Sequence, residues 1–288
     1  MRPTLPFSLM ASALGAFAQT SKSGSVWVTP HEQYSSSVGV LGCLVDSNRI
    51  AYWPASVDCD NICVRLSHEG REVYLLRVDQ SQGAYDVSYD AWNYLYTGKS
   101  ASKAPAVGGP VAMDFETVDA DKCKDLIHTD GHKLPLSASN SMNYLASCLA
   151  DEDSWVAQNY VLYNILDPIC SMGTKEKCPL DWPAANQASC PSGLGVPSVL
   201  EGEAVYNIQY GTGKMVSSQT NLVVNDAPSS AQAAAPGGMY VRYTKPGFSA
   251  AHVAKRTVSA GERQLYKVDN HPSQSPCLIV ADSDFMRA

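Results

Sequence analysis

Nine cysteines are the residues of this sequence whose chemistry is easiest to predict. Cysteine forms disulfides in oxidising compartments and binds metals elsewhere, and zinc sites usually contain closely spaced pairs such as Cys-x-x-Cys. No such pair occurs, so we expect no metal site. Cys277 stands far from the rest, and the spacing of the others leaves their pairing open. We predict that four disulfides join the remaining eight: Cys43, Cys59, Cys63, Cys123, Cys148, Cys170, Cys178 and Cys190.

Aromatic side chains form the second chemical group, because an aromatic face can stack on a sugar ring in a carbohydrate-binding groove. Trp53, Tyr85 and Tyr94 are the candidate ligand-binding residues. Trp92 is assigned to the core instead, because it recurs with neighbouring aromatic residues at helical spacing. The six histidines are scattered, and we expect them in solvated loops. No Gly-x-Ser-x-Gly segment supports a serine hydrolase.

The N-terminus and the composition indicate the compartment. Residues 1–18 have a positive start at Arg2, an apolar run and an Ala-x-Ala cleavage site at Ala16–Ala18, which is typical of a secretory signal peptide. The 288 residues carry a net charge of −7, with 17% charged residues. Nucleic-acid and membrane partners need clustered lysine and arginine, so we expect neither. We predict a secreted, extracellular protein without cofactors.

Short strands and turns dominate residues 38–118, after a polar leader predicted for residues 19–37. One helix is expected over Tyr89–Tyr96, with Ser88 as its N-cap and Gly98 near its end. Gly70 marks a hairpin turn. A small β-barrel accommodates this pattern. The predicted strands are Val38–Val45, Ile62–Ser67, Glu72–Asp79 and Val111–Thr117.

The second half has a different pattern. Residues 119–195 are predicted to form a helical region held by disulfides, at least one of which leads back to the first half. Helices are expected over Ser139–Leu149 and Ser154–Leu166. Residues 196–225 predict a short β-hairpin with strands Val205–Tyr210 and Leu222–Val224. Residues 226–288 have the composition of a low-complexity linker and a disordered tail.

One segment resembles a known family. The strand Tyr74–Asp79, followed by a loop and by Asp-Val-Ser-Tyr-Asp-Ala-Trp-Asn-Tyr-Leu at residues 86–95, is similar to the closing half of the double-psi β-barrel. That barrel is shared by expansins, barwin-like proteins, family 45 endoglucanases and RlpA-like proteins. The resemblance covers about 80 residues and implies a six-stranded double-psi barrel. The overall layout also resembles secreted proteins of filamentous fungi, some of which act as effectors.

The resemblance also implies a candidate catalytic residue. In the sugar-cleaving members, the aspartate that opens this motif donates a proton to the glycosidic oxygen, and Asp86 stands at that position. Glycoside hydrolysis needs a second carboxylate. Asp79 is the candidate partner, and Asp46 is another. The family's Tyr-x-Asp element near the first strands is missing, and a structural role for Asp86 before the helix is the alternative.

Three functions remain open. The preferred hypothesis is a non-enzymatic, effector-like protein that binds cell-wall carbohydrate or a host protein. The first alternative is a polysaccharide-acting hydrolase or lytic enzyme that uses Asp86. The second is a structural protein of the cell wall or spore coat.

Overall fold

The computed structural model describes residues 22–224 and two short strands, Leu265–Lys267 (β12) and Leu278–Val280 (β13). The chain divides into two units, Met1–Val241 and Arg242–Ala288. In the second unit, β12 and β13 pair in antiparallel fashion. The predicted signal peptide, Cys277 and most of the predicted disordered tail lie outside the described residues.

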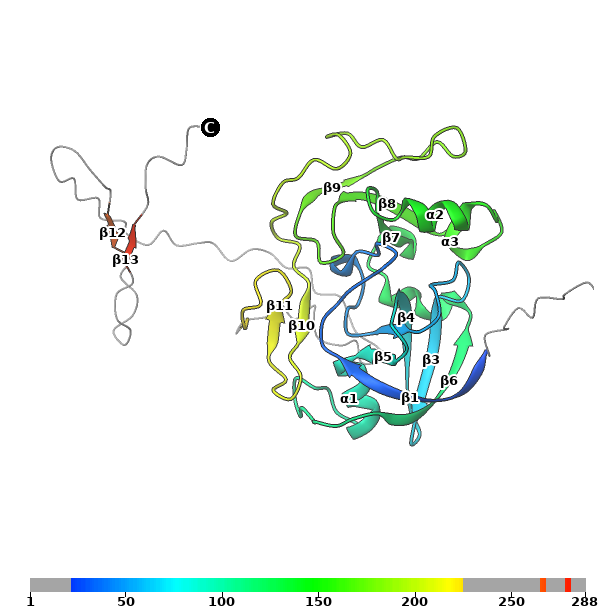
Figure 1. Ribbon diagram of the computed structural model, residues 1–288, viewed down its shortest axis with the longest axis vertical. Helices are drawn as coiled ribbons and strands as arrows, with labels where there is room; N and C mark the ends of the chain where they lie inside the picture. Colours follow the sequence, from blue (N-terminus) through cyan, green and yellow to red (C-terminus); the bar gives the residue numbers. More distant parts are fainter. Residues whose placement is uncertain (1–21, 225–264, 268–277, 281–288) are drawn as a thin grey trace, which may run out of the picture. The chain divides into compact units, whose positions relative to one another are not determined.

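Six strands of the first unit close into a barrel, in the order β1-β5-β2-β4-β3-β6 (Figure 1). The pairs β1·β5 and β2·β4 are parallel, and the other four are antiparallel. Closure pairs every strand on both sides and so removes exposed sheet edges. The strands are β1 (Ser23–His31), β2 (Ile50–Trp53), β3 (Cys63–His68), β4 (Arg71–Gln80), β5 (Tyr85–Ser88) and β6 (Val111–Val118).

The barrel begins earlier than the sequence analysis predicted. Part of the segment assigned to a polar leader, residues 19–37, forms β1, which pairs with both β5 and β6. Val26 and Val28 pack against the barrel interior, whereas Trp27 between them is exposed. This alternation is what a half-buried strand requires, and the many serines around it concealed it.

The strand predicted over Val38–Val45 is also wrong. This segment forms a short 3-10 turn at Gly42–Leu44 (η1), flanked by isolated bridges at Val40 and Val45. Val40 pairs with Leu136 and Val45 pairs with Ile127, both in the second half of the chain. The apolar run is therefore buried against the second half of the chain. A run of apolar residues alone does not distinguish such burial from pairing in a sheet.

The hairpin and the helix predicted for the barrel are confirmed. β3 and β4 are joined by a two-residue turn at Glu69 and Gly70, whose φ angles are 49° and 78°. Positive φ at both positions fits the twist of the strands. Helix α1 (Tyr89–Thr97) ends at Gly98, which adopts a left-handed conformation. Ser88 precedes α1, but its hydroxyl donates to Ser47 O and accepts from Ile50 N instead of capping the helix.

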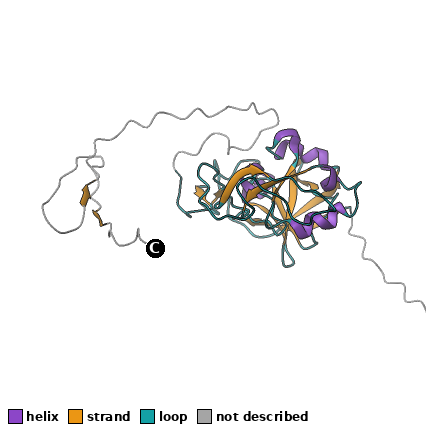
Figure 2. Ribbon diagram, turned by 90° about the horizontal axis from the view of Figure 1, so that it is seen from above, coloured by secondary structure: helices purple, strands orange, loops and turns teal. Residues whose placement is uncertain are grey.

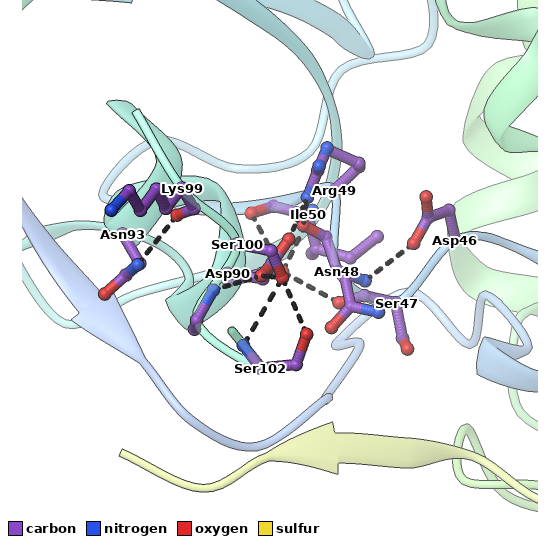
Figure 3. Close-up of polar contacts among 12 residues, drawn as sticks. Asp46, Ser47, Asn48, Arg49, Ile50, Asp90, Asn93, Lys99, Ser100 and Ser102 are labelled. Carbon is purple, nitrogen blue, oxygen red and sulfur yellow. Dashed lines mark hydrogen bonds and ion pairs between the residues drawn. The ribbon is translucent and has the colours of Figure 1, made fainter. Parts of the chain in front are cut away.

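A buried ion pair ties α1 to the start of β2 (Figure 3). Asp90 Oδ2 lies 2.9 Å from Arg49 Nη1, and the Asp90 side chain is 1% exposed. Its other oxygen accepts from Ser100 Oγ at 2.6 Å and from Ala101 N at 2.7 Å. Because buried charges are tolerated only when they are paired and hydrogen-bonded, this contact set explains why an aspartate can occupy the core. It fixes α1 against the barrel.

The second half forms a lobe that packs on one side of the barrel (Figure 1). Its sheet has the order β7-β8-β9, where β7 (Leu134–Ser137) and β8 (Tyr160–Ile165) are parallel and β9 (Gly173–Lys177) is antiparallel to β8. Its helices are α2 (Met142–Leu149) and α3 (Trp155–Gln158), and its 3-10 turns are η2 (Ala120–Leu126) and η3 (Asp130–His132). Figure 2 shows short helices at the periphery of a unit made mostly of strands and loops.

The prediction of a helical region over residues 119–195 did not include the β7-β8-β9 sheet. Two further details of this half also differ from the prediction. The helix expected over Ser154–Leu166 ends after a single turn, because the β-favouring residues that follow form β8. The predicted hairpin also has a different second strand. β10 (Tyr206–Ile208) pairs with β11 (Met215–Ser217), and residues 222–224 contribute one bridge, from Val223 to Val216.

All eight cysteines predicted to form disulfides are paired. Three disulfides link the barrel half to the second lobe, as expected: Cys43–Cys170, Cys59–Cys148 and Cys63–Cys123. The fourth, Cys178–Cys190, closes a short loop within the lobe.

Candidate functional site

Four polar residues lie side by side across four strands of the barrel. Thr29 on β1 is opposite Asp86 on β5, Asp86 is opposite Tyr52 on β2, and Tyr52 is opposite Asp79 on β4. Residues directly opposite each other in a sheet place their side chains on the same face. A register shift between Ala51 and Tyr52 brings Asp79 into this row, as bulges near functional sites often do. The two predicted carboxylates therefore flank one tyrosine.

Asp79 is occupied by the segment that follows β1. Its Oδ2 accepts from Ser35 Oγ at 2.5 Å, and its Oδ1 accepts from Ser37 N at 2.9 Å and from Gln80 N at 2.8 Å. Both oxygens thus hold the chain in place. A carboxylate bound in this way stabilises a loop and is poorly available for proton transfer.

Tyr52 fills the space between the two aspartates. Its side chain is 3% exposed, and the ring of His31 packs on it with 4.4 Å between the ring centroids. Burial raises the pKa of Tyr52 well above its usual value, and the charges of Asp79 and Asp86 raise it further. The tyrosine is therefore neutral at ordinary pH, and its buried side chain lies between the two carboxylates in the row.

Asp86 has fewer hydrogen bonds than Asp79. It is partly exposed, and its Oδ1 accepts a short hydrogen bond from Thr29 Oγ1. Thr29 also lines a groove beside the row. Asp86 therefore contacts the wall of a surface depression through Thr29, whereas both oxygens of Asp79 are hydrogen-bonded to the chain.

The groove runs along β1 and the loop that precedes β5. Its volume is about 460 Å³. Trp27 borders it with 67% of its surface exposed, and Tyr85 contributes a second aromatic side chain. The lining residues carry no charge: Ser25, Val26, Trp27, Thr29, Gly83, Ala84, Tyr85 and Pro110.

Two of the predicted aromatic binding residues do not reach this groove. Trp53 is 4% exposed, and its ring packs edge-on against Tyr85 and Phe115 at centroid distances of 5.2 and 5.0 Å. The Arg77 guanidinium also lies over the Trp53 ring, 5.2 Å from its centroid, so the structure places Trp53 in the packed core. Tyr94 lies on α1 and packs half-buried against the same core. Tyr85 is the one predicted aromatic residue that lines the groove.

Asp46, the other aspartate considered as a partner for Asp86, lies outside the row. It belongs to the turn before β2, where its side chain accepts from Asn48 N at 3.0 Å. A carboxylate that bonds to the backbone two residues later is a common turn-forming arrangement. Asp46 therefore organises a turn.

Sequence reasoning missed Trp27, Thr29, His31 and Tyr52, which bring this site together. Three of them lie in β1, a segment assigned to the leader. The signal was present, because Val26 and Val28 alternate with Trp27 and Thr29 in a β-favouring segment. Tyr52 had no local signal, since its role comes from pairing with two distant strands.

Comparison of the chain with protein-family models, curated proteins and solved structures finds no match. Within residues 22–224, no group of three or more histidine, cysteine, aspartate or glutamate side chains is arranged to hold a metal ion. None of the helices that the structure describes has the length and apolar character needed to cross a membrane.

Proposed function

We propose that this protein is an extracellular double-psi β-barrel that binds cell-wall polysaccharide through the groove along β1 and does not cleave it. The observation that carries the proposal is the side chain of Trp27, which is 67% exposed at the edge of a groove that Tyr85 also lines. A large aromatic ring left in water is a favourable place for an apolar face to dock.

The chemistry of the groove supports a sugar ligand. Sugars present apolar C–H faces and a rim of hydroxyl groups. The groove offers the ring of Trp27 to such a face, and the hydroxyl groups of Ser25 and Thr29 to such a rim. Its open form suits a chain-like ligand that continues beyond the groove.

The arrangement of the carboxylates favours binding over cleavage. Asp79 and Asp86 lie on strands separated by β2, which places Tyr52 between them. An inverting glycosidase needs its two carboxyl groups about 6.5–9.5 Å apart with a water between them. Here Tyr52 fills the intervening space, and the Ser35–Ser37 segment occupies Asp79.

The fold and the disulfides support the rest of the proposal. Two parallel strand pairs within a closed six-stranded barrel agree with the double-psi arrangement that the segment around Asp86 resembles. Four disulfides suit an oxidising, extracellular environment.

The test is retention of the purified protein on insoluble chitin, cellulose and β-glucan, compared with Trp27→Ala. We expect the wild type to bind at least one polymer and Trp27→Ala to lose about tenfold in affinity. Trp182→Ala is the matched control, because Trp182 is a half-buried tryptophan of the second lobe, and it should bind like the wild type.

Three outcomes would contradict this proposal. Failure to bind any polymer would leave a protein partner or a structural role. Equal binding by Trp27→Ala would place the ligand elsewhere. Release of reducing ends that disappears in Asp86→Asn would establish the enzymatic alternative.

A further inference from the structure

Two carboxylates flank Trp27 on the outer face of the barrel. Thr29, two residues after Trp27 on β1, is opposite Asp86 on β5. Ser25, two residues before it, is opposite Asp114 on β6. Alternate residues of a strand share a face, and opposite residues do too. Asp86 and Asp114 therefore lie on the Trp27 face, on the two strands that neighbour β1.

Neither carboxylate is neutralised by a cation within residues 22–224. Asp86 and Asp114 take part in none of the ion pairs found there. Arg65 on β3 is committed to Glu72 and Glu116, at 3.2 and 2.7 Å. The groove lining itself is uncharged, so these two carboxylates supply negative charge beside it.

An exposed indole between two uncompensated carboxylates is suited to a protonated amine. The carboxylates attract the cation, and the face of a tryptophan attracts it as well. A polyuronate would place its own carboxylates beside Asp86 and Asp114 and be repelled. The chain's net charge of −7 acts in the same direction.

We propose, building on the polysaccharide-binding function above, that the groove prefers a glycan with free amino groups, such as a glucosamine polymer. The ring of Trp27 contacts the apolar face of a sugar unit. Asp86 and Asp114 contact ammonium groups on either side of it. The acetylated form of the same polymer lacks these charges and binds more weakly.

The experiment measures the affinity of the full chain for glucosamine oligomers, N-acetylglucosamine oligomers and oligogalacturonate of equal length. The measurement is made at about pH 5, where amines are protonated. We expect the glucosamine oligomer to bind about fivefold tighter than the acetylated one, and oligogalacturonate to bind weakest. Added salt should reduce the preference, because these charges are exposed to solvent.

Asp114→Asn isolates the charge without touching the groove lining. It should reduce the logarithm of the affinity ratio between the glucosamine and acetylated oligomers by about half. The affinity for the acetylated oligomer should stay unchanged. Asp153→Asn is the matched control, because Asp153 is an exposed aspartate of the second lobe. It should change neither affinity.

The outcomes separate this inference from the function on which it rests. Equal affinity for the two oligomers, both lost in Trp27→Ala, would overturn the amine preference and keep the binding function. No affinity for any oligomer would overturn both. Equal binding of a lysine oligomer of matched charge would also overturn the inference, since it would show attraction to charge without recognition of the sugar.

Discussion

The two sides of this barrel differ in what covers them. The outer face of β2 and β4 is sealed by the second lobe, where Ile50 and Leu76 pack with Leu136 and Leu162. All four residues of β2 are buried, whereas β1 has only Val28 buried among nine residues. Strand β2 is therefore buried on both faces, and β1 alternates.

This difference separates the strands that stabilise the fold from the strand that is available to a ligand. Burial on both faces stabilises a strand but leaves no surface for a ligand. The β1 side forgoes that stabilisation and keeps Trp27 exposed. The row from Thr29 to Asp79 crosses from the uncovered strand β1 to the covered strand β4, so Asp86 bonds to the groove residue Thr29 and Asp79 bonds to the Ser35–Ser37 segment.

The largest expected effect comes from removing a disulfide on the covered side. Cys63→Ala/Cys123→Ala opens a link between residues 60 apart and should lower the free energy of unfolding by about 4 kcal/mol. Cys178→Ala/Cys190→Ala, whose residues are 12 apart, should cost about 3 kcal/mol. Urea unfolding measures both. A larger loss in the second variant would contradict the expectation that the disulfide between barrel and lobe stabilises the fold more than the one within the lobe.

Truncation within the covered core should have the next largest effect. Leu76 is fully buried on the lobe side of β4. Leu76→Ala leaves a cavity there and should lower the free energy of unfolding by about 3 kcal/mol. The same urea experiment measures it. A loss below about 1 kcal/mol would mean that the lobe does not seal this face.

Alkaline pH should lower the free energy of unfolding through Tyr52, which lies between the covered and uncovered sides. Because burial raises the pKa of Tyr52 in the folded state, its contribution to stability is complete below the unfolded pKa of about 10 and is lost as the pH rises above it. The free energy of unfolding should fall by about 1.4 kcal/mol per pH unit for this group. Tyr52→Phe should reduce that slope, measured by urea unfolding between about pH 9 and 11.

Tyr96→Phe is the control for this titration, because Tyr96 is 44% exposed. It controls for the loss of one tyrosine hydroxyl at an exposed position. An unchanged slope in Tyr52→Phe would contradict the burial of Tyr52 beside the two aspartates.

The smallest effect is expected on the open side. Trp27→Ala removes a ring that is 67% exposed, so it should change the free energy of unfolding by no more than about 0.5 kcal/mol. Thermal or urea unfolding measures this. A loss comparable to that of Leu76→Ala would show that Trp27 belongs to a packed interface.

Local patterns predicted the elements whose structure is set by near neighbours. The β3–β4 hairpin and α1 followed from alternation, a glycine turn and a helix stop, and the structure confirms them. The choice of cysteines was also predictable, because the eight that pair lie apart from Cys277. Their partners were not, since a pairing such as Cys43 with Cys170 depends on how distant segments meet.

The site was less predictable, for a physical reason. Asp79 and Asp86 were identified as candidates, but their different environments depend on Tyr52 and on the Ser35–Ser37 segment, which meet them through sheet register. Trp53 is of a residue type that is common in binding sites, but its side chain is buried in the core. Trp27 is exposed instead, because β1 lies on the uncovered side of the barrel. No local sequence pattern shows which side of the barrel is covered.

The position at which a glycan contacts the protein tests binding by the β1 groove most directly. Backbone amide shifts recorded by NMR during titration with a chitin-derived oligomer would locate the contact residue by residue. We predict changes centred on Trp27, Thr29 and Tyr85, with the second lobe unaffected. Changes centred on the second lobe, or none at concentrations where the oligomer is retained, would contradict the assignment of the β1 groove as the binding site.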